Sequence, residues 1–346
     1  MTKKQELKDQ LLPNNYLPNL LNLVSSRGGN VAHVLSRAGL DTRHVEPLNA
    51  TIRWAQFHDI IVAAREEINE PGLGLYLGSQ LTITTHGLLG LAAMSSANLE
   101  ETAELAGRYI ATRTPLVALR LEKNSRYAFL NIDELFVLGD IRTTFLEILA
   151  ETLQAVVRFV SGNQCQLQEV RFAFQEPKYS RLYQAFFDCP VVFNAPANQL
   201  VLNIADLALP CILADAQAKQ QAAQQCQLLL SEWQAKQNLS GQIRLILGRA
   251  KGRFPSYEQV ADELAMAPRT LRRRLAEEET SYQQLVEEWR QDMAHQYLTT
   301  TGLSIQQIAY VLGYADPANF GRAFRKWHPG VSPSQYRLQH QTRLNV

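Results

Sequence analysis

SIQQIAYVLGYADPANFGRAFRKW, from Ser304 to Trp327, is the stretch that decides the fold, and SYEQVADELAMAPRTLRRRLAE, from Ser256 to Glu277, repeats its design. Each stretch begins with a short helix that has one apolar face, continues through a turn, and ends in a second helix whose apolar residues lie four apart. Positions before the turn recur after 48 residues, as Val260 and Ile308 do, and positions after it recur after 49. The sequence therefore contains two copies of the same unit.

A helix, a tight turn and a second helix form the helix-turn-helix pattern, in which the second helix enters the major groove of DNA. A single match is a weak indication, because any helical hairpin shows this spacing. Two matches in register, each with arginine on the outer face of its second helix, are a strong one. The pattern predicts an all-α DNA-binding domain at residues 238–346, with helix-turn-helix units at 257–277 and 304–327.

The outer faces of the two second helices supply the predicted DNA contacts. The apolar residues must face the core, so the remaining positions point outward. We predict contacts from Arg269, Thr270, Arg272, Arg273, Arg274, Ala318, Asn319, Arg322, Arg325 and Lys326. Arginine can hold guanine through two hydrogen bonds, asparagine suits adenine, and alanine can meet a thymine methyl group. We expect the first face to carry most of the sequence specificity and the second to hold the register on the DNA backbone. The alternative is an ordinary solvated charged face.

One long helix is predicted to join the two units. Residues 281–298 carry a single apolar stripe, which indicates a packed helix and not a flexible tether. Ser-x-x-Gln capping boxes open this helix and three others, which begin after Ser256, Ser304 and Ser332. At 1.5 Å per residue the joining helix spans roughly 26 Å, enough to hold two reading helices about one DNA turn apart.

Residues 1–237 alternate between helical and strand patterns, which predicts an α+β domain. Helices are expected at 16–26, 30–38, 54–68, 86–95, 98–112 and 139–160, and strands at 116–121, 127–132, 170–174, 191–193 and 200–204. A Gln- and Ala-rich stretch, 214–237, is either the last helix of this domain or part of a dimer contact. The linker is expected at Asn238–Ser240, before a helix at Ile243–Arg249.

Composition limits the classes of protein to which the chain can belong. Its 346 residues suit two domains, it has no run of about 18 uncharged apolar residues, and its start is polar. We therefore expect a cytoplasmic protein with no membrane partner. The net charge is only +1, but charge segregated to one face is enough for DNA binding. Cys165, Cys189, Cys211 and Cys226 share no CxxC spacing, so we expect reduced core cysteines, no metal site and no cofactor.

The C-terminal residues resemble the DNA-binding domain of AraC/XylS-type bacterial transcription regulators. The resemblance covers roughly 243–337 and is densest in SIQQIA at 304–309, LGY at 312–314, FGRAFRKW at 320–327 and GVSPSQYR at 330–337. Two departures are Ala267, where the family often has a serine cap, and the absence of a glycine near Glu279. Pro268 compensates in part for Ala267, because proline favours the first helical position. The resemblance implies promoter DNA and RNA polymerase as partners.

The first domain resembles the arabinose-binding-type sensor half found in one subgroup of these regulators. The similarity lies in GLGLYLG at 72–78, HGLLG at 86–90 and residues 187–193. It implies that the domain binds an unidentified small-molecule effector, forms a homodimer, or does both.

Several residues of the first domain are open to two interpretations. Gly72, Gly74 and Gly78 suit close helix packing better than a phosphate cradle, because the pattern is not GxGxxG after a strand. His86 either lines a pocket or fills a core or capping position. Four arginines surround the predicted hairpin and either pair with an acidic ligand or lie on the surface: Arg113, Arg120, Arg126 and Arg142.

The leading hypothesis is a one-component regulator in which the first domain senses a small molecule and the second engages promoter DNA. An architectural DNA-binding protein is one alternative, and it predicts a solid first domain without a pocket. A DNA-repair alkyltransferase fusion is another, but it needs a zinc-binding cysteine cluster or an activated cysteine, which the scattered cysteines do not offer. We expect that the protein is not an enzyme.

Overall fold

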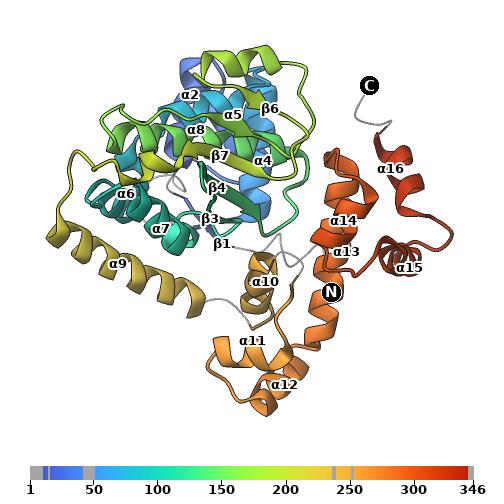
Figure 1. Ribbon diagram of the computed structural model, residues 1–346. Helices are drawn as coiled ribbons and strands as arrows, with labels where there is room; N and C mark the ends of the chain where they lie inside the picture. The colour runs from blue at the N-terminus through green and yellow to red at the C-terminus, as the bar shows by residue number, and fades with distance from the viewer. Residues whose placement is uncertain (1–10, 15, 42–50, 236–238, 251–252, 342–346) are drawn as a thin grey trace.

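The chain folds into an α+β N-terminal half and an all-helical C-terminal half, as predicted (Figure 1). The computed structural model describes residues 11–14, 16–41, 51–235, 239–250 and 253–341. The larger apolar core gathers buried side chains from Leu12 to Cys211, and a second core gathers them from Leu239 to Phe324.

Within its described residues, the first half contains the helices that apolar periodicity predicts and one more. The predicted ones are α2 (Leu17–Ser26), α3 (Val31–Arg37), α4 (Trp54–Glu67), α6 (Gly87–Met94), α7 (Leu99–Tyr109) and α8 (Arg142–Val160). The additional helix is α5 (Leu73–Gln80), which is buried along both its leucine and its glycine positions. A helix that is apolar all round shows no amphipathic period, so the pattern could not reveal it.

A five-stranded sheet packs beside these helices, with strand order β3-β4-β7-β5-β6. The strands are β3 (Val117–Lys123), β4 (Tyr127–Glu134), β5 (Glu169–Arg171), β6 (Val191–Val192) and β7 (Asn198–Asn203). β3 and β4 form the predicted hairpin, and β5 pairs in parallel with β6 and antiparallel with β7. β5 is shorter than the alternation at 170–174 predicts, because Phe172 and Phe174 lie beyond its end in the apolar core.

Short elements complete this half. β1 (Leu11–Pro13) pairs with β2 (Thr51–Arg53), and three-residue strands are too short to show an alternating period. In the part of the chain that the structure describes, five 3-10 turns join the longer elements: η2 (Ile83–His86), η3 (Ile110–Thr112), η4 (Gly139–Ile141), η5 (Ser180–Ala185) and η6 (Ile204–Ala208).

The glycines of GLGLYLG bring α5 against α8, which confirms the packing role predicted for them. A Cβ atom on Gly74 would lie 2.3 Å from the Thr144 carbonyl oxygen, and one on Gly78 would lie 2.8 Å from the Glu151 Cβ. Only glycine leaves room for the two helix backbones to approach this closely.

α9 (Ala216–Ala235) is the Gln- and Ala-rich helix, and it packs on the first half. Ala222, Cys226 and Leu230 are buried in a small cluster with residues of α6 and α7. Leu228, on the opposite side of the helix, and Leu229, at the edge of the buried face, are exposed. α9 is therefore a helix of the first half with a partly apolar outer face.

The second half consists of seven helices in the described residues: α10 (Leu239–Arg249), α11 (Tyr257–Glu263), α12 (Pro268–Glu277), α13 (Tyr282–Thr300), α14 (Ile305–Val311), α15 (Pro317–Trp327) and α16 (Pro333–Gln341). The capping boxes at Ser256 and Ser304 are both present, and Ser281 caps α13 through its hydroxyl. α13 buries Leu285, Trp289 and Met293, as its apolar stripe predicts.

α10 begins four residues earlier than predicted, at Leu239 rather than Ile243. The Glu278 carboxylate accepts hydrogen bonds from the backbone N–H groups of Leu239 and Ser240, at 2.8 and 2.9 Å. Glu278 thus caps the helix from a distant position in the chain. The predicted linker at Asn238–Ser240 is therefore wrong for its last two residues, and the domain boundary after residue 237 lies outside the described residues.

The turn after α11 holds Ala265 in a left-handed conformation, with φ of 50°, where the second unit has Gly313, with φ of 76°. Both turns close with the same bond: the Met266 N–H donates to the Ala261 carbonyl, and the Tyr314 N–H to that of Ala309. A residue other than glycine is strained in this region by roughly 1–2 kcal/mol.

We expect Ala265→Gly to stabilise the second half by about 1 kcal/mol, because strain relief exceeds the entropy that glycine adds to the unfolded chain. Urea unfolding followed by circular dichroism measures the change. Gly313→Ala is the matched control and should lose a similar amount. A less stable Ala265→Gly protein would contradict this account of the turn.

Candidate DNA-binding surfaces and effector pocket

α12 and α15 turn their apolar residues inward and their arginines outward. Leu271 and Leu275 of α12 are buried, as are Phe320 and Phe324 of α15. At 100° per residue, the position directly opposite each apolar pair is Arg273 in α12 and Arg322 in α15. The two reading helices therefore present equivalent faces on one helical scaffold.

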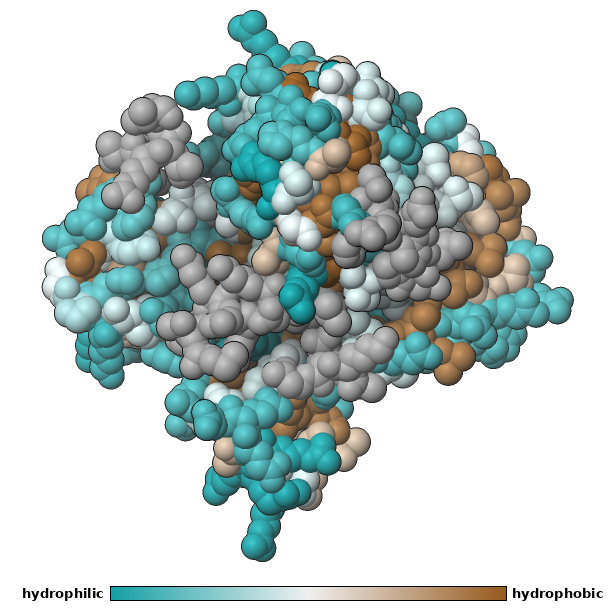
Figure 2. Space-filling view, turned by 180° about the vertical axis from the view of Figure 1, so that it is seen from behind, coloured by the Kyte–Doolittle hydropathy of each residue, from teal (hydrophilic) through white to brown (hydrophobic). Residues whose placement is uncertain are grey.

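The outer face of α12 is densely cationic. Arg269, Arg272, Arg273 and Arg274 are exposed, and Thr270 is half-buried beside them. Arg273 pairs with Glu277 at 2.7 Å, but the two side chains are 67% and 57% exposed. An exposed pair of this kind contributes little, so DNA phosphates or bases can readily displace it. Hydrophilic side chains predominate, with some apolar ones among them, on the lobe that α11 and α12 form at the bottom of Figure 2.

The outer face of α15 is more sparsely charged. Ala318, Arg322, Arg325 and Lys326 are exposed, and Asn319 is half-buried. The Asn319 amide is already engaged, because its Nδ2 donates to Asp316 at 2.8 Å and its Oδ1 accepts from Arg322. To meet an adenine, Asn319 must exchange these contacts.

Other arginines hold the surfaces in place. Arg290 donates to the carbonyl oxygens of Leu312 and Gly313, at 3.0 and 3.3 Å, at the end of α14. Arg337 donates to the Leu298 and Leu303 carbonyls and ties α16 to the end of α13. Their half-buried side chains position the second unit and do not belong to its outer face.

The first half contains a cavity of about 120 Å³ between its helices and the start of the sheet. α8 supplies one wall, a stripe comprising Phe145, Ile148, Leu149, Thr152, Leu153 and Val156. Side chains of α2, α4, α5, α6 and α7, of the strands β1 to β3, and of the segments between these elements supply the rest, and most of them are aliphatic or aromatic. The large core is therefore not solid, contrary to what an architectural DNA-binding protein predicts.

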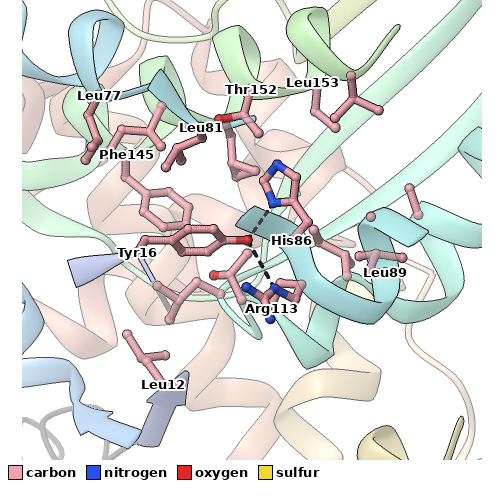
Figure 3. A pocket seen from close by; sticks show the side chains of 18 of the residues that line it. Leu12, Tyr16, Leu77, Leu81, His86, Leu89, Arg113, Phe145, Thr152 and Leu153 are labelled. Atoms are coloured by element: carbon pink, nitrogen blue, oxygen red, sulfur yellow. Dashed lines mark hydrogen bonds between the residues drawn. The ribbon is translucent and has the colours of Figure 1, made fainter. Parts of the chain in front are cut away.

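A small polar group lies at one side of this cavity. The Tyr16 hydroxyl lies between His86 and Arg113 (Figure 3): it is 2.9 Å from His86 Nδ1 and accepts from Arg113 Nε at 3.3 Å. Burial, with the nearby Arg113 charge, lowers the pKa of His86 to about 4, so the ring is neutral at pH 7. Burial also raises the pKa of Tyr16, which keeps the phenol protonated.

Among the residues singled out in the sequence, His86 and Arg113 line the cavity and the other three arginines do not. Arg120 pairs with Asp133 and Glu122, Arg126 lies over the Tyr127 ring, and Arg142 forms a buried ion pair. Sequence reasoning missed Tyr16 and Thr152. Thr152 interrupts the apolar stripe of α8, and a polar residue on a buried face was the signal available.

α8 links the cavity to the second half of the protein. Arg142, in its first turn, donates to both carboxylate oxygens of Glu134 and to the Thr300 carbonyl at the end of α13. Gln296 of α13 donates to Glu134 at 2.8 Å and accepts from the Leu138 N–H at 3.1 Å. One helix therefore forms a wall of the cavity and also contacts the helix that joins the two helix-turn-helix units.

The cysteines have no features of an activated nucleophile. Cys165, Cys211 and Cys226 are buried and Cys189 is partly buried, all as free thiols. Burial raises the pKa of Cys165 to about 12 and that of Cys189 to about 11. Reactive cysteines have lowered pKa values, so these thiols are poor nucleophiles.

Comparison with known proteins identifies both halves. Residues 28–211, more than half of the chain, match the family described as the arabinose-binding domain of AraC transcription regulators. The chain belongs to the AraC family of transcription regulators. Residues 260–339 of this AraC-family regulator match a helix-turn-helix domain. It is therefore a sequence-specific DNA-binding regulator with an N-terminal ligand-sensing domain.

Similar regulators come from Pseudomonas aeruginosa and Mycobacterium tuberculosis. An ornithine utilization regulator of Pseudomonas aeruginosa is 34% identical to this chain, and the matched region covers 95% of this chain and 96% of the regulator. The regulator VirS of Mycobacterium tuberculosis is 28% identical over 84% and 85% of the two chains. The crystal structure of the regulator CdpR from Pseudomonas aeruginosa is 24% identical, with a TM-score of 0.44, over 93% of this chain and 98% of that one. Among the described residues of the AraC-family regulator, no helix is long and apolar enough to span a membrane.

Proposed function

We propose that this regulator reads two successive major-groove segments of promoter DNA with α12 and α15, and that an effector in the cavity controls how these helices engage DNA. The observation that supports the first part is the pair of equivalent outward faces carrying Arg273 and Arg322. α13 has 19 residues, a rise of about 28 Å, which suits helices separated by about one turn of DNA.

The two faces have different tasks in this proposal. The α12 residues Arg269, Thr270, Arg272, Arg273 and Arg274 carry most of the base discrimination. Residues of α15 supply one further base contact through Arg322 and otherwise hold the register: Ala318, Asn319, Arg325 and Lys326. The denser arginine face of α12 supports this division, because arginine can hold guanine through two bonds.

The contrast between Arg273→Ala and Arg325→Ala tests the proposal. Arg273→Ala should lower the discrimination between bases at particular positions of the site by roughly 1–3 kcal/mol. Arg325→Ala should instead weaken binding to all DNA sequences alike, and the salt dependence of binding should fall by the equivalent of about one phosphate contact. Binding-site selection and fluorescence anisotropy at several salt concentrations measure these effects. Arg108→Ala, an exposed site on α7 of the sensor half, is the control and should change neither. Equal loss of specificity in both arginine variants would contradict the division of tasks.

The effector signal travels through α8 in this proposal. An occupant of the cavity contacts the middle of α8, and Arg142 at the start of that helix contacts α13 through Thr300 and Glu134. A small displacement of α8 therefore changes the interface that positions both reading helices.

Further partners follow from promoter binding. We place the protein in the bacterial cytoplasm, in contact with RNA polymerase, as a homodimer that pairs through the exposed Leu228 and Leu229 of α9. Light scattering of the wild type and of Leu228→Gln/Leu229→Gln measures the pairing, and an unchanged mass in the variant would exclude this face.

We propose no catalytic role, and the raised pKa values of the buried cysteines support this. We do not extend ornithine, named for the Pseudomonas relative, to this cavity, because its described lining residues include no carboxylate to pair with two ammonium groups.

A further inference from the structure

We propose that the cavity takes a straight-chain aliphatic carboxylate, with its chain along α8 and its carboxylate at His86 and Thr152. This inference rests on the proposed role of the cavity as the effector site, and names the ligand class. It follows from the shape of the cavity, the chemistry of its wall, and two of the buried polar atoms of its lining, which have no hydrogen-bond partner among the described residues.

The shape favours a thin chain. The cavity follows α8 from Phe145 to Val156, which is about 16 Å at 1.5 Å per residue. Its volume of about 120 Å³ is close to that of engineered apolar cavities of roughly 150 Å³ that hold benzene. A cavity with this volume and this length has a narrow cross-section. It therefore suits an unbranched chain of roughly six to eight carbons better than a wide ring or a sugar.

The wall favours an apolar chain. The lining is almost wholly aliphatic and aromatic, with leucines from six different elements. A sugar would leave most of its hydroxyl groups without hydrogen bonds in such a wall, and each such group would cost binding free energy. A methylene chain meets the wall with no polar atoms to satisfy.

The hydrogen bonds of Tyr16 are the basis on which we assign the proton of the neutral His86 ring to one of its nitrogens. Arg113 Nε donates to the Tyr16 oxygen, so we assign the single hydroxyl proton of Tyr16 to the bond with His86 Nδ1. A neutral histidine that accepts at Nδ1 carries its proton at Nε2. His86 Nε2 is therefore an N–H donor.

His86 Nε2 has no hydrogen-bond partner among the described residues, and neither has the Thr152 hydroxyl. The two residues line the same cavity and are only 8% and 7% exposed. Unsatisfied buried donors of this kind are rare and need an explanation. A ligand group that accepts two hydrogen bonds satisfies both.

The charge of the lining selects a carboxylate among acceptors. Arg113 is the charged side chain among the described lining residues, and no aspartate or glutamate is among them. A head group that combines two acceptor oxygens with a negative charge fits the two donors in a lining whose charged side chain is cationic. An ammonium head would face donors and a like charge.

Isothermal titration calorimetry of the full-length protein at pH 7.5 tests the assignment with four probes: hexanoate, octanoate, 1-hexanol and hexylammonium. We expect hexanoate to bind, octanoate to bind up to roughly 15-fold more tightly, at about fourfold per methylene group, and hexylammonium not to bind. Hexanol should bind at least about tenfold more weakly than hexanoate, because it lacks the charged acceptor. Equal binding of hexanol or hexylammonium, or no binding of either carboxylate, overturns the inference.

Thr152→Val separates a ligand contact from a structural role. It removes the unsatisfied hydroxyl with little change in shape, so the ligand-free protein should melt at a higher temperature while hexanoate binding weakens about tenfold or more. Thr143→Val, on the same helix but outside the cavity lining, is the matched control and should leave hexanoate affinity unchanged. Unchanged hexanoate affinity in Thr152→Val overturns the placement of the carboxylate. DNA binding by the same samples tests the proposed function separately, because specific promoter binding can persist when the ligand class is wrong.

Discussion

Arg142→Met is expected to lower the free energy of unfolding by about 3–5 kcal/mol, because it leaves the Glu134 carboxylate buried without its counter-charge. Arg142 Nε and Nη2 donate to the two carboxylate oxygens at 2.8 and 2.6 Å, and both side chains are only 3% exposed. Asn198 and Gln296 donate to the same carboxylate but carry no charge. Urea unfolding followed by circular dichroism measures the loss.

Two further variants make the Arg142 result specific. Arg142→Met/Glu134→Leu removes both charges and should recover most of the stability, since apolar pairs often replace buried ion pairs without loss. Arg158→Met is the control on the same helix, and it breaks the ion pair with Asp188. The side chains of Arg158 and Asp188 are 35% and 84% exposed, so this variant should lower the free energy of unfolding by about 1 kcal/mol or less. A double variant as unstable as Arg142→Met would show that charge burial is not the cause.

The Arg142 pair also reports on communication between the halves. The double variant keeps apolar contact at the interface but loses the hydrogen bonds from Arg142 to Thr300 and from Gln296 to Glu134. We expect it to bind promoter DNA while losing the response to an effector, which anisotropy titrations with and without the ligand measure. A full response in the double variant would exclude this route of coupling.

Gly74→Ala is expected to destabilise the sensor half by about 3 kcal/mol, because the new methyl group has no space between α5 and α8. It would lie 2.3 Å from the Thr144 carbonyl oxygen and 2.7 Å from the Glu147 Cβ. Backbone atoms cannot move aside as a flexible side chain can, so the helices must separate. Glu147 accepts from the Tyr179 hydroxyl at 2.8 Å and from that of Tyr183, so separation also disturbs these buried bonds.

Thermal and urea unfolding of Gly74→Ala measure the destabilisation. Gly321→Ala is the control, since Gly321 is a helical glycine in α15 with open space where its Cβ would lie. It should gain up to about 1 kcal/mol from helix propensity. The prediction fails if Gly74→Ala also gains stability, because the close approach would then be unimportant.

The successes of sequence-based prediction share a physical cause. Helix starts at Ser256 and Ser304 depend on residues three positions away, and the inward or outward direction of a side chain in α12 depends on residues four positions away. Local interactions of this kind are visible in one stretch of chain. The failures have the opposite cause. Glu278 caps α10 across 39 residues, and α5 shows no period because its leucines and its glycines are buried alike.

The sequence by itself determined the duplicated helix-turn-helix, the outward arginines and the family, because helical periodicity and capping act within a few residues. Only the tertiary structure decided where Tyr16, His86, Arg113 and Thr152 meet, since the packing of four separate elements sets their distances. It likewise decided that Arg142 is buried against Glu134 and α13. The proposed DNA contacts are therefore set by local sequence, whereas the cavity and the contact of α8 with α13 depend on residues far apart in the chain.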